Sequence, residues 1–253
     1  MAVDEALLLS VAAEQTLPTV RFYAWTPPCL SLGYAQPLSD VDLAQLASRQ
    51  WGLVRRPTGG RAILHTDELT YSVVAPMSEP RVRGGVVESY RRLSAGLVRG
   101  LDLMGLAAQA DREYALPGRD AKGAVCFETP SNYEITVGEK KLLGSAQTRK
   151  QGVVLQHGAL PLSGDIARIC DVLRFDSDDE RRQARERVSR RATTLSTCCE
   201  AVTWEQAAEA LARGFTEMLN VTLERVELTS AQAEMAARLR AEKYASAEWN
   251  ERL

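Results

Sequence analysis

Two adjacent glycines stand between arginines in RRPTGGRAILH, residues 55–65. Glycine tolerates positive φ and leaves backbone N–H groups unobstructed, so this loop suits a phosphate, a carboxylate or a thioester carbonyl. A tight turn between two strands, flanked by surface arginines, explains the same pattern, so the loop alone is a weak signal. Its candidate binding residues are Arg56, Thr58, Gly59, Gly60, Arg61 and, at its end, His65.

Cys126 is the second candidate for chemistry. It lies in AVCFETPSNYE, within a polar stretch at 111–131 that contains glycine and proline, and not on the apolar face of a helix. A thiolate is a strong nucleophile, but a free cysteine in a protein is more often inert packing. From context alone, Cys126 is therefore a possible nucleophile and no more.

A lysine pair in EKKLLGSAQ is the third candidate. Strand alternation places Lys140 and Lys141 on opposite faces, so one of them is predicted to face inward. An inward lysine is costly unless it binds an anionic group, whereas on an exposed edge strand neither lysine would matter. The pattern does not choose between the two. The neighbouring candidates are Gly144, Ser145 and Ala146, with His157 and Gly158 on the next strand-like run.

Only two histidines occur in the chain, His65 and His157, and each follows a strand-like run. A lone histidine in such a place is more often a hydrogen-bonded structural residue than a ligand or a base. Neither is assigned as the base for any incoming nucleophile.

The elements that must position these residues alternate between strand and helix. Short β-rich runs such as TVRFYAW, LSLGYA, GLVRR and LTYSVVAP precede an apolar helical stripe from Val86 to Leu101. Two capping boxes are predicted, Ser39 with Asp42 and Thr203 with Gln206. Residues 174–192 carry charges of both signs and indicate an exposed helix or a connector. Along the sequence, the predicted strands come first, mixed with helices, and further helices gather near the C-terminus. This order favours an α+β fold with a mixed sheet.

Composition excludes several classes of protein. The 253 residues are 45% hydrophobic and 25% charged with a formal net charge of −2, so nothing draws the whole chain to nucleic acid or to a membrane. No signal peptide or apolar run of about 20 residues is visible. Five cysteines without a CxxC pair suggest neither disulfides nor a zinc site, so we expect a reduced, cytoplasmic protein without a metal.

Four segments together resemble the lipoate/biotin protein ligase family: RRPTGGRAILHTDELTYSV, CFETPSNYEI, GEKKLLGSAQTRKQGVVLQHGALPL and KYASAEWN, in that order. The resemblance covers essentially the whole chain. It implies one α/β catalytic domain over 1–253, related to class II aminoacyl-tRNA synthetases, with a helical portion from about residue 165. Relatives usually have a strand-forming segment before the first helix, which implies a longer native N-terminus or a missing edge strand.

Within that family the chain is most similar to cysteine-dependent octanoyltransferases, because it has GGR instead of a third glycine and a cysteine 15 positions before Lys141. The resemblance implies a Cys126 acyl thioester, with Gly59 and Gly60 beside the acyl pocket and Lys141 at the reacting carbonyl. It implies octanoyl acyl carrier protein as the donor, glycine cleavage H protein or another lipoyl domain as the acceptor, no cofactor, and a monomer.

Two other functions stay open. In an ATP-dependent lipoate or octanoate ligase, Gly59, Gly60 and Arg56 would hold the phosphate of an acyl-adenylate, and Cys126 would be incidental. The absence of an accessory domain after Leu253 and the bulky Arg61 in the loop favour the transferase. A non-catalytic module that binds acyl or lipoyl groups is the third possibility. The acyl chain length depends on pocket shape, which the sequence does not report.

Overall fold

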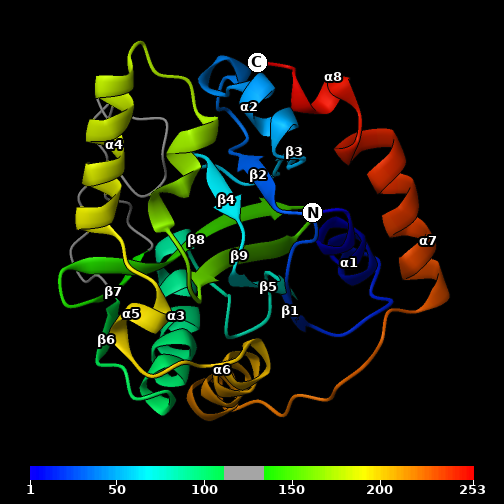
Figure 1. The fold of residues 1–253 in the computed structure, drawn as a ribbon. Helices are drawn as coiled ribbons and strands as arrows, with labels where there is room; N and C mark the ends of the chain where they lie inside the picture. Colours follow the sequence, from blue (N-terminus) through cyan, green and yellow to red (C-terminus); the bar gives the residue numbers. More distant parts are fainter. Residues whose placement is uncertain (111–133) are drawn as a thin grey trace.

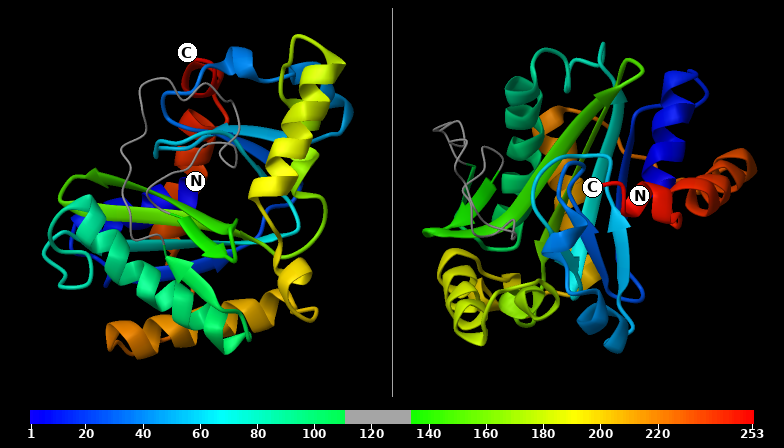
Figure 2. Two further views of the ribbon diagram at one scale, coloured as in Figure 1. Left: turned by 90° about the vertical axis from the view of Figure 1, so that its left-hand side faces the viewer. Right: turned by 90° about the horizontal axis from the view of Figure 1, so that it is seen from above.

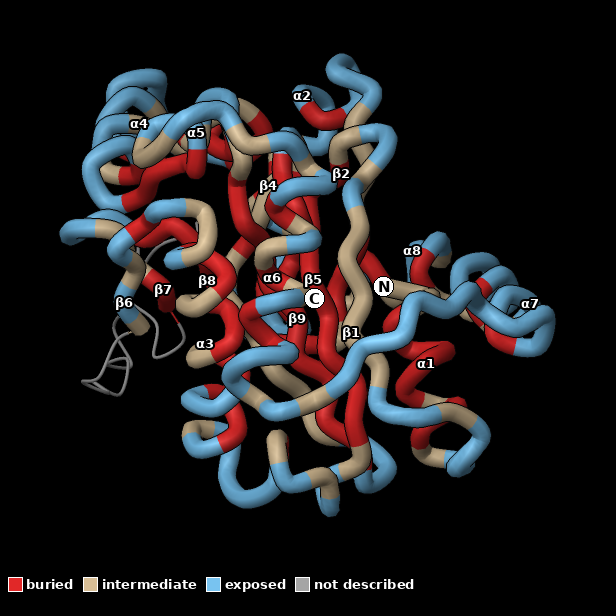
Figure 3. Tube along the Cα trace, turned by 90° about the horizontal axis from the view of Figure 1, so that it is seen from below, coloured by how far each residue is buried: buried red, intermediate tan, exposed pale blue. Residues whose placement is uncertain are grey.

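The computed structural model describes residues 1–110 and 134–253, and its centre is a six-stranded antiparallel sheet (Figure 1). The central strands are buried along most of their length, whereas the helices around them expose one side (Figure 3). In spatial order the sheet consists of β1 (Thr19–Tyr23), β5 (Glu68–Pro76), β9 (Val153–Pro161), β8 (Lys140–Lys150), β7 (Glu134–Val137) and β6 (Ala108–Ala110).

A second sheet of three strands carries the glycine loop. Its order is β3 (Gly52–Arg55), β2 (Cys29–Leu32), β4 (Ile63–His65), with β2 parallel to β3 and antiparallel to β4. The predicted α+β class with a mixed sheet flanked by helices is confirmed, and among the strand pairs of the described part of the chain only β2 and β3 are parallel. Residues 56–62 join β3 to β4, so the loop lies at one end of this sheet.

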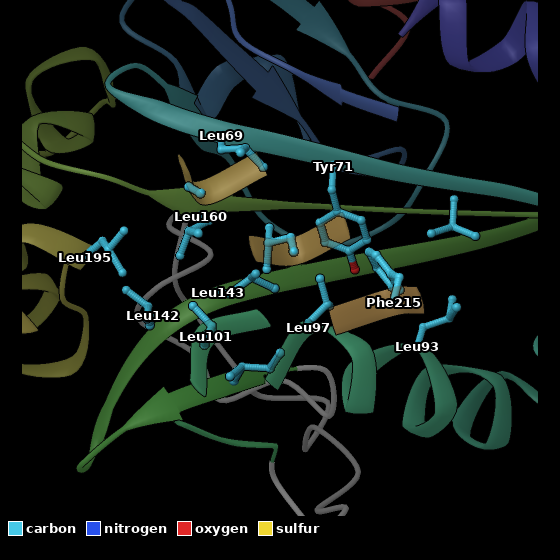
Figure 4. Packing of buried hydrophobic residues seen from close by; sticks show 14 of the residues in the cluster. Leu69, Tyr71, Leu93, Leu97, Leu101, Leu142, Leu143, Leu160, Leu195 and Phe215 are labelled. Atoms are coloured by element: carbon cyan, nitrogen blue, oxygen red, sulfur yellow. The ribbon is translucent and has the colours of Figure 1, made fainter. Parts of the chain in front are cut away.

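Two helices, α3 (Val86–Leu103) and α6 (Trp204–Leu219), cover one face of the large sheet. Their backbones approach closely, since a Cβ added at Gly214 would lie 2.2 Å from the carbonyl oxygen of Gly96. Tyr71, Leu97 and Phe215 meet in the core between the helices and the strands (Figure 4). The predicted helical stripe and the predicted capping box at Thr203 are both confirmed.

The opposite face is covered by α1 (Ala2–Ala12), with α7 (Ser230–Leu239) packed outside it (Figure 2, right). Leu7, Leu8 and Val11 of α1 contact Val74 and Leu155 of the sheet. Two acidic residues near the start of α1 are buried as well, and their partners decide how this helix docks.

A third group of elements packs against the small sheet. It consists of η1 (Leu38–Asp40), α2 (Leu43–Ser48), η2 (Ile166–Val172) and α4 (Asp178–Arg191), whereas the short α5 (Leu195–Cys198) packs into the core of the large sheet. The charged segment is a helix, α4, that buries only Ala184 and Val188. The predicted capping box at Ser39 is wrong, because Asp42 itself is the N-cap of α2 and accepts a hydrogen bond from the Gln45 N–H.

The C-terminal KYASAEWN motif links α1 to the small sheet. It forms the π-helical turn η3 (Arg240–Tyr244) and the short α8 (Ala247–Asn250). Lys243 and Tyr244 bind the carboxylate of Glu5 at 2.6 and 2.7 Å, and Asn250 accepts from the Arg55 N–H at 2.7 Å. The motif therefore holds α1 and the glycine loop in place. Within the described residues, no helix is long and apolar enough to cross a membrane.

Candidate functional site

Lys141 is the lysine that faces inward. Its side chain is 4% exposed at the start of β8, whereas Lys140 is exposed. The Lys141 Nζ lies 2.8 Å from Oε1 of Glu134, which is itself buried on β7. A lysine buried beside one carboxylate keeps its ammonium in a site of low water content, where its field on a bound carbonyl is strong.

Glu134 was not identified from the sequence. It belongs to the NYEITV run, and the pairing of β7 with β8 brings it to Lys141 across a register shift between Ile135 and Thr136. An acidic residue at a position that alternates inward was the available signal. What the sequence could not show is that the irregular pairing aims both side chains at one point.

Gly144 makes room for the Lys141 side chain. A Cβ added at Gly144 would lie 2.8 Å from Lys141 Cε and 3.1 Å from Nζ. Any larger residue would push the amine away from its present position. The main chain of Lys141 is held too, because its carbonyl accepts from the Thr193 N–H at 2.9 Å.

Arg56 shapes the glycine loop from inside. Its guanidinium donates to the carbonyls of Gly59 and Arg61 at 2.9 and 2.7 Å, and to the Ser31 carbonyl at 3.1 Å. The side chain is buried, so these bonds replace water along the folded loop. In this geometry Arg56 holds the loop carbonyls and is not directed at an open phosphate site. The Arg61 residue is partly exposed.

The loop lies close against the small sheet. Gly60 has φ of +94°, and a Cβ added at Gly33 would lie 1.8 Å from the Gly60 carbonyl oxygen. Gly59, by contrast, faces open space, because nothing lies within 4 Å of an added Cβ. The loop therefore presents the bare backbone at Gly59 on its outer side.

His65 belongs to a chain of buried hydrogen bonds behind the loop. Its Nε2 lies 2.8 Å from Ser31 Oγ and its Nδ1 lies 2.7 Å from Glu68 Oε1. The ring also stacks on Trp25, with centroids 4.3 Å apart and planes 14° apart. Both ring nitrogens and one ring face are thus occupied by protein groups.

His157 links the loop to the large sheet. Its Nε2 lies 2.6 Å from Thr58 Oγ1, next to the two glycines. Its Nδ1 is buried, makes no hydrogen bond within the described residues, and lies 4.0 Å from Oδ2 of Asp4. Burial lowers the pKa of His157 below 6.5, although Asp4 opposes that shift, so the ring is neutral at pH 7.

Asp4 is held firmly in its place under His157. Its carboxylate accepts from Arg21 at 2.8 Å and from the hydroxyls of Tyr23 and Ser72, both at 2.9 Å. Burial alone would raise the pKa of Asp4, but the N-terminal amino group, His157 and Arg21 lower it far more. The carboxylate is ionised at every pH of interest.

The register of the large sheet sorts the remaining candidates between its two faces. Glu134 pairs with Gly144 and Ala146 pairs with His157, so these four residues share the face with Lys141. Ser145 and Gly158 alternate to the other face, where Ser145 Oγ lies 2.7 Å from the Tyr71 hydroxyl. A Cβ at Gly158 would come within 2.6 Å of the Tyr71 ring. Cys126 lies outside the described residues.

The chain matches known proteins along nearly all of its length. The family model of the lipoyl protein ligase A/B catalytic domain matches residues 1–216. The octanoyltransferase LipM of Kyrpidia tusciae is 46% identical, covering 100% of this chain and 93% of that protein. LipM of Staphylococcus aureus is 39% identical, covering 98% and 92%.

Two solved structures of lipoate protein ligases superpose on nearly the whole chain. A bi-partite lipoate protein ligase from Thermoplasma acidophilum, studied with its E2 lipoyl domain, superposes with a TM-score of 0.82 at 25% identity, covering 99% of this chain and 89% of that one. Lipoate-protein ligase A bound with ATP superposes with a TM-score of 0.80 at 28% identity, covering 99% and 92%.

Proposed function

Because the chain belongs to the lipoyl protein ligase A/B catalytic-domain family, we propose that it is a protein octanoyltransferase of lipoate assembly. It moves an octanoyl group from a thioester on acyl carrier protein to a lysine of a lipoyl domain, such as glycine cleavage H protein, through a thioester on Cys126. Full-length similarity to octanoyltransferases supports the transfer. The observation that carries the site is the buried Lys141 ammonium, held by Glu134 over Gly144.

The reaction has two steps. The Cys126 thiolate attacks the thioester carbonyl of the donor, a new C–S bond forms, and the carrier thiolate leaves and takes up a proton. The ε-amine of the acceptor lysine then attacks the octanoyl thioester on Cys126. The amide C–N bond forms, the amine loses a proton, and the Cys126 thiolate leaves. Two exchanges at an activated carbonyl replace one direct transfer between two proteins.

Lys141 supplies positive charge to both steps. An ammonium beside the thiol favours the thiolate, and the same group stabilises the oxyanion that forms on the octanoyl carbonyl. A single oxyanion donor contributes on the order of 10²–10³ in rate. Glu134 and Gly144 determine where that ammonium points, since one binds Nζ and the other leaves space for the side chain.

The loop and the strand face form the acyl pocket in this proposal. Gly59 presents open backbone, Thr58 and Arg61 flank the glycine pair, and Arg56 keeps the loop folded. Across from it, Gly144 and Ala146 face the same side of the sheet as Lys141, while His65, Ser145 and Gly158 support the site from behind. The reaction needs no cofactor. We place it in one chain in the cytoplasm, where thiols stay reduced.

An adduct experiment tests the proposal. The protein is incubated with octanoyl acyl carrier protein without ATP and analysed by intact mass spectrometry. We expect one hydroxylamine-sensitive octanoyl adduct, which Cys126→Ser abolishes and Cys198→Ser, a half-exposed control cysteine, preserves. Lys141→Ala should slow transfer on the order of 100-fold or more per folded molecule, although the loss of the cation beside Glu134 also lowers stability.

Three outcomes would contradict parts of this proposal. Loading of free octanoate that depends on ATP, without the adduct, would make the chain a ligase like the ATP-bound structural relative. Binding of octanoyl protein without any product would make it a non-catalytic module. Near-normal turnover in Lys141→Ala would remove Lys141 from the site.

A further inference from the structure

Thr58, His157 and Asp4 form a buried row from the glycine loop to α1. Thr58 Oγ1 lies 2.6 Å from His157 Nε2, and the other ring nitrogen, Nδ1, lies 4.0 Å from Asp4 Oδ2. Thr58 is 1%, His157 5% and Asp4 1% exposed. The order hydroxyl, imidazole, carboxylate is the arrangement in which histidine acts as a base and the carboxylate orients it.

The hydrogen positions follow from the partners. Asp4 is ionised and can only accept, so the ring proton of the neutral histidine belongs on Nδ1, the nitrogen nearer to Asp4. Nε2 then has a free electron pair, and the Thr58 hydroxyl donates to it. This leaves the lone pairs of Thr58 oxygen to accept a hydrogen bond from another group.

The gap between Nδ1 and Asp4 is informative because it occurs in a well-packed interior. A buried N–H without a hydrogen bond costs free energy, so such groups are uncommon and often functional. A distance of 4.0 Å is too long for a hydrogen bond to a neutral ring but short enough for a strong attraction to an imidazolium. Asp4 therefore offsets part of the cost that burial imposes on an imidazolium at His157.

We propose that Thr58 and His157 receive the proton of the acceptor lysine amine during amide formation, with Asp4 as the positioning residue. The proposal rests on the octanoyltransferase function and assigns the base for its second step. Thr58 touches the substrate amine, His157 stores the proton, and Asp4 acts through His157.

The proton transfer balances. As the amine nitrogen bonds to the octanoyl carbon, its N–H bond breaks and the proton joins the Thr58 oxygen. The Thr58 O–H bond breaks at the same time, and that proton joins His157 Nε2 to give an imidazolium. When the C–S bond breaks and the enzyme thiolate leaves, the proton returns through Thr58 to the thiolate or to solvent. No oxidant, reductant or further reactant is consumed.

The location of the row fits this task. His157 pairs with Ala146, and Lys141 packs over Gly144, two residues earlier on the same face of β8. Two residues along a strand span about 7 Å, so the Lys141 ammonium over Gly144 and the ring of His157 beside Ala146 lie near each other on one face of the sheet. Lys141 stabilises the oxyanion while the loop hydroxyl takes the proton.

The charges around His157 come from three elements. Asp4 favours the imidazolium, whereas Arg56 of the loop and the N-terminal amino group oppose it. Arg21 and Tyr23 of β1 contact Asp4 and not the histidine. The ring is thus neutral before the reaction and is charged only while it holds the transferred proton.

Separated half-reactions test the inference. The octanoyl-enzyme is prepared from wild type, His157→Gln, Thr58→Val and Thr58→Ser, freed of donor, and mixed with an unmodified lipoyl domain. Amide formation is followed by mass spectrometry and compared with the rate of enzyme acylation. We expect the ratio of the acceptor rate to the acylation rate to fall about 100-fold in His157→Gln and Thr58→Val. Thr58→Ser, which keeps the hydroxyl, should restore the ratio to within about 3-fold of wild type.

The pH dependence provides a readout that a purely structural role would not move. The acceptor rate of wild type should show an inflection below pH 6.5 from His157, in addition to the continued rise as the acceptor lysine loses its proton, whereas His157→Gln should show the rise from the lysine alone. If His157→Gln does not fold, the Thr58→Val and Thr58→Ser pair decides the question alone. An unchanged ratio, or equal losses in both half-reactions, would overturn the inference. Absence of an acyl-enzyme in wild type would overturn the proposed function itself, and the inference with it.

Discussion

The two histidines of the chain stand in the same kind of row but differ at one nitrogen. His65 lies between Ser31 and Glu68 with both nitrogens hydrogen-bonded, at 2.8 and 2.7 Å, and its ring is stacked on Trp25. His157 lies between a hydroxyl and a carboxylate too, but its Nδ1 stops 4.0 Å short of the carboxylate.

The difference separates a fully hydrogen-bonded row from a row in which one ring nitrogen has no hydrogen bond to the described residues. In the His65 row both ring nitrogens are hydrogen-bonded and the ring is stacked, so every polar ring atom has a partner inside the protein. In the His157 row, a second proton would tighten the contact with Asp4. The two rows therefore contain similar residue types but differ in function, and the Nδ1 of His157, which has no hydrogen bond in the described part of the chain, is the feature that distinguishes the two rows.

The largest effect expected from this comparison is on stability. His65→Ala removes the stack on Trp25 and one hydrogen bond each from the buried Ser31 and Glu68, and it leaves a cavity, so we expect a loss of about 3–5 kcal/mol in the free energy of unfolding. His157→Ala should cost less, about 1–2 kcal/mol, since one hydrogen bond is lost. Urea unfolding of both variants measures the two losses. Equal losses would mean that the two rows are equally structural.

A smaller effect is expected from Glu68→Gln. The amide keeps one oxygen that can accept, but Glu68 receives bonds from both His65 and Thr70, and the charge that strengthens them is lost. We expect a loss of about 2 kcal/mol in stability. The ratio of the two half-reaction rates should stay within about 2-fold of wild type, because this row is not on the proton path. If the ratio fell as far as we expect for His157→Gln, the base would belong to the His65 row and not to the His157 row.

Local sequence patterns predicted which segments are helices and strands better than they predicted which of these elements lie side by side. The stripe from Val86 to Leu101 and the capping box at Thr203 identify their helices, because helical spacing and caps are local properties. Strand alternation identifies strands but not partners, so the order in which β1, β5 and β9 lie side by side was not predictable.

The sequence motifs predicted the lysine and the glycine loop of the candidate site. They did not predict its two carboxylates. Lys141 and the glycine loop stand out by residue type. Asp4 and Glu134 do not, because each acquires its role only when distant strands or a helix bring it to a basic partner. Acidic residues inside an otherwise apolar helix start, as in VDEALLL, are the signal that could have revealed Asp4.

The smallest effect that separates the two rows is a dependence of stability on pH. Burial holds the pKa of His157 below its unfolded value of 6.5, so between those two values the unfolded chain binds a proton that the folded chain does not. Stability from this group is therefore complete above pH 6.5 and decreases as the pH falls below it, by at most about 1.4 kcal/mol per pH unit.

We expect wild type to lose more stability than His157→Gln between pH 7 and pH 5.5, measured by urea unfolding at each pH. Asp4 does not interfere with this window, because its pKa is lowered from 3.8 and its stabilising effect is lost only below that value. The difference between the two proteins cancels the titration of all groups that they share. Parallel curves for wild type and His157→Gln would mean that folding leaves the proton affinity of His157 unchanged. The two histidine rows would then not differ in how they respond to a proton.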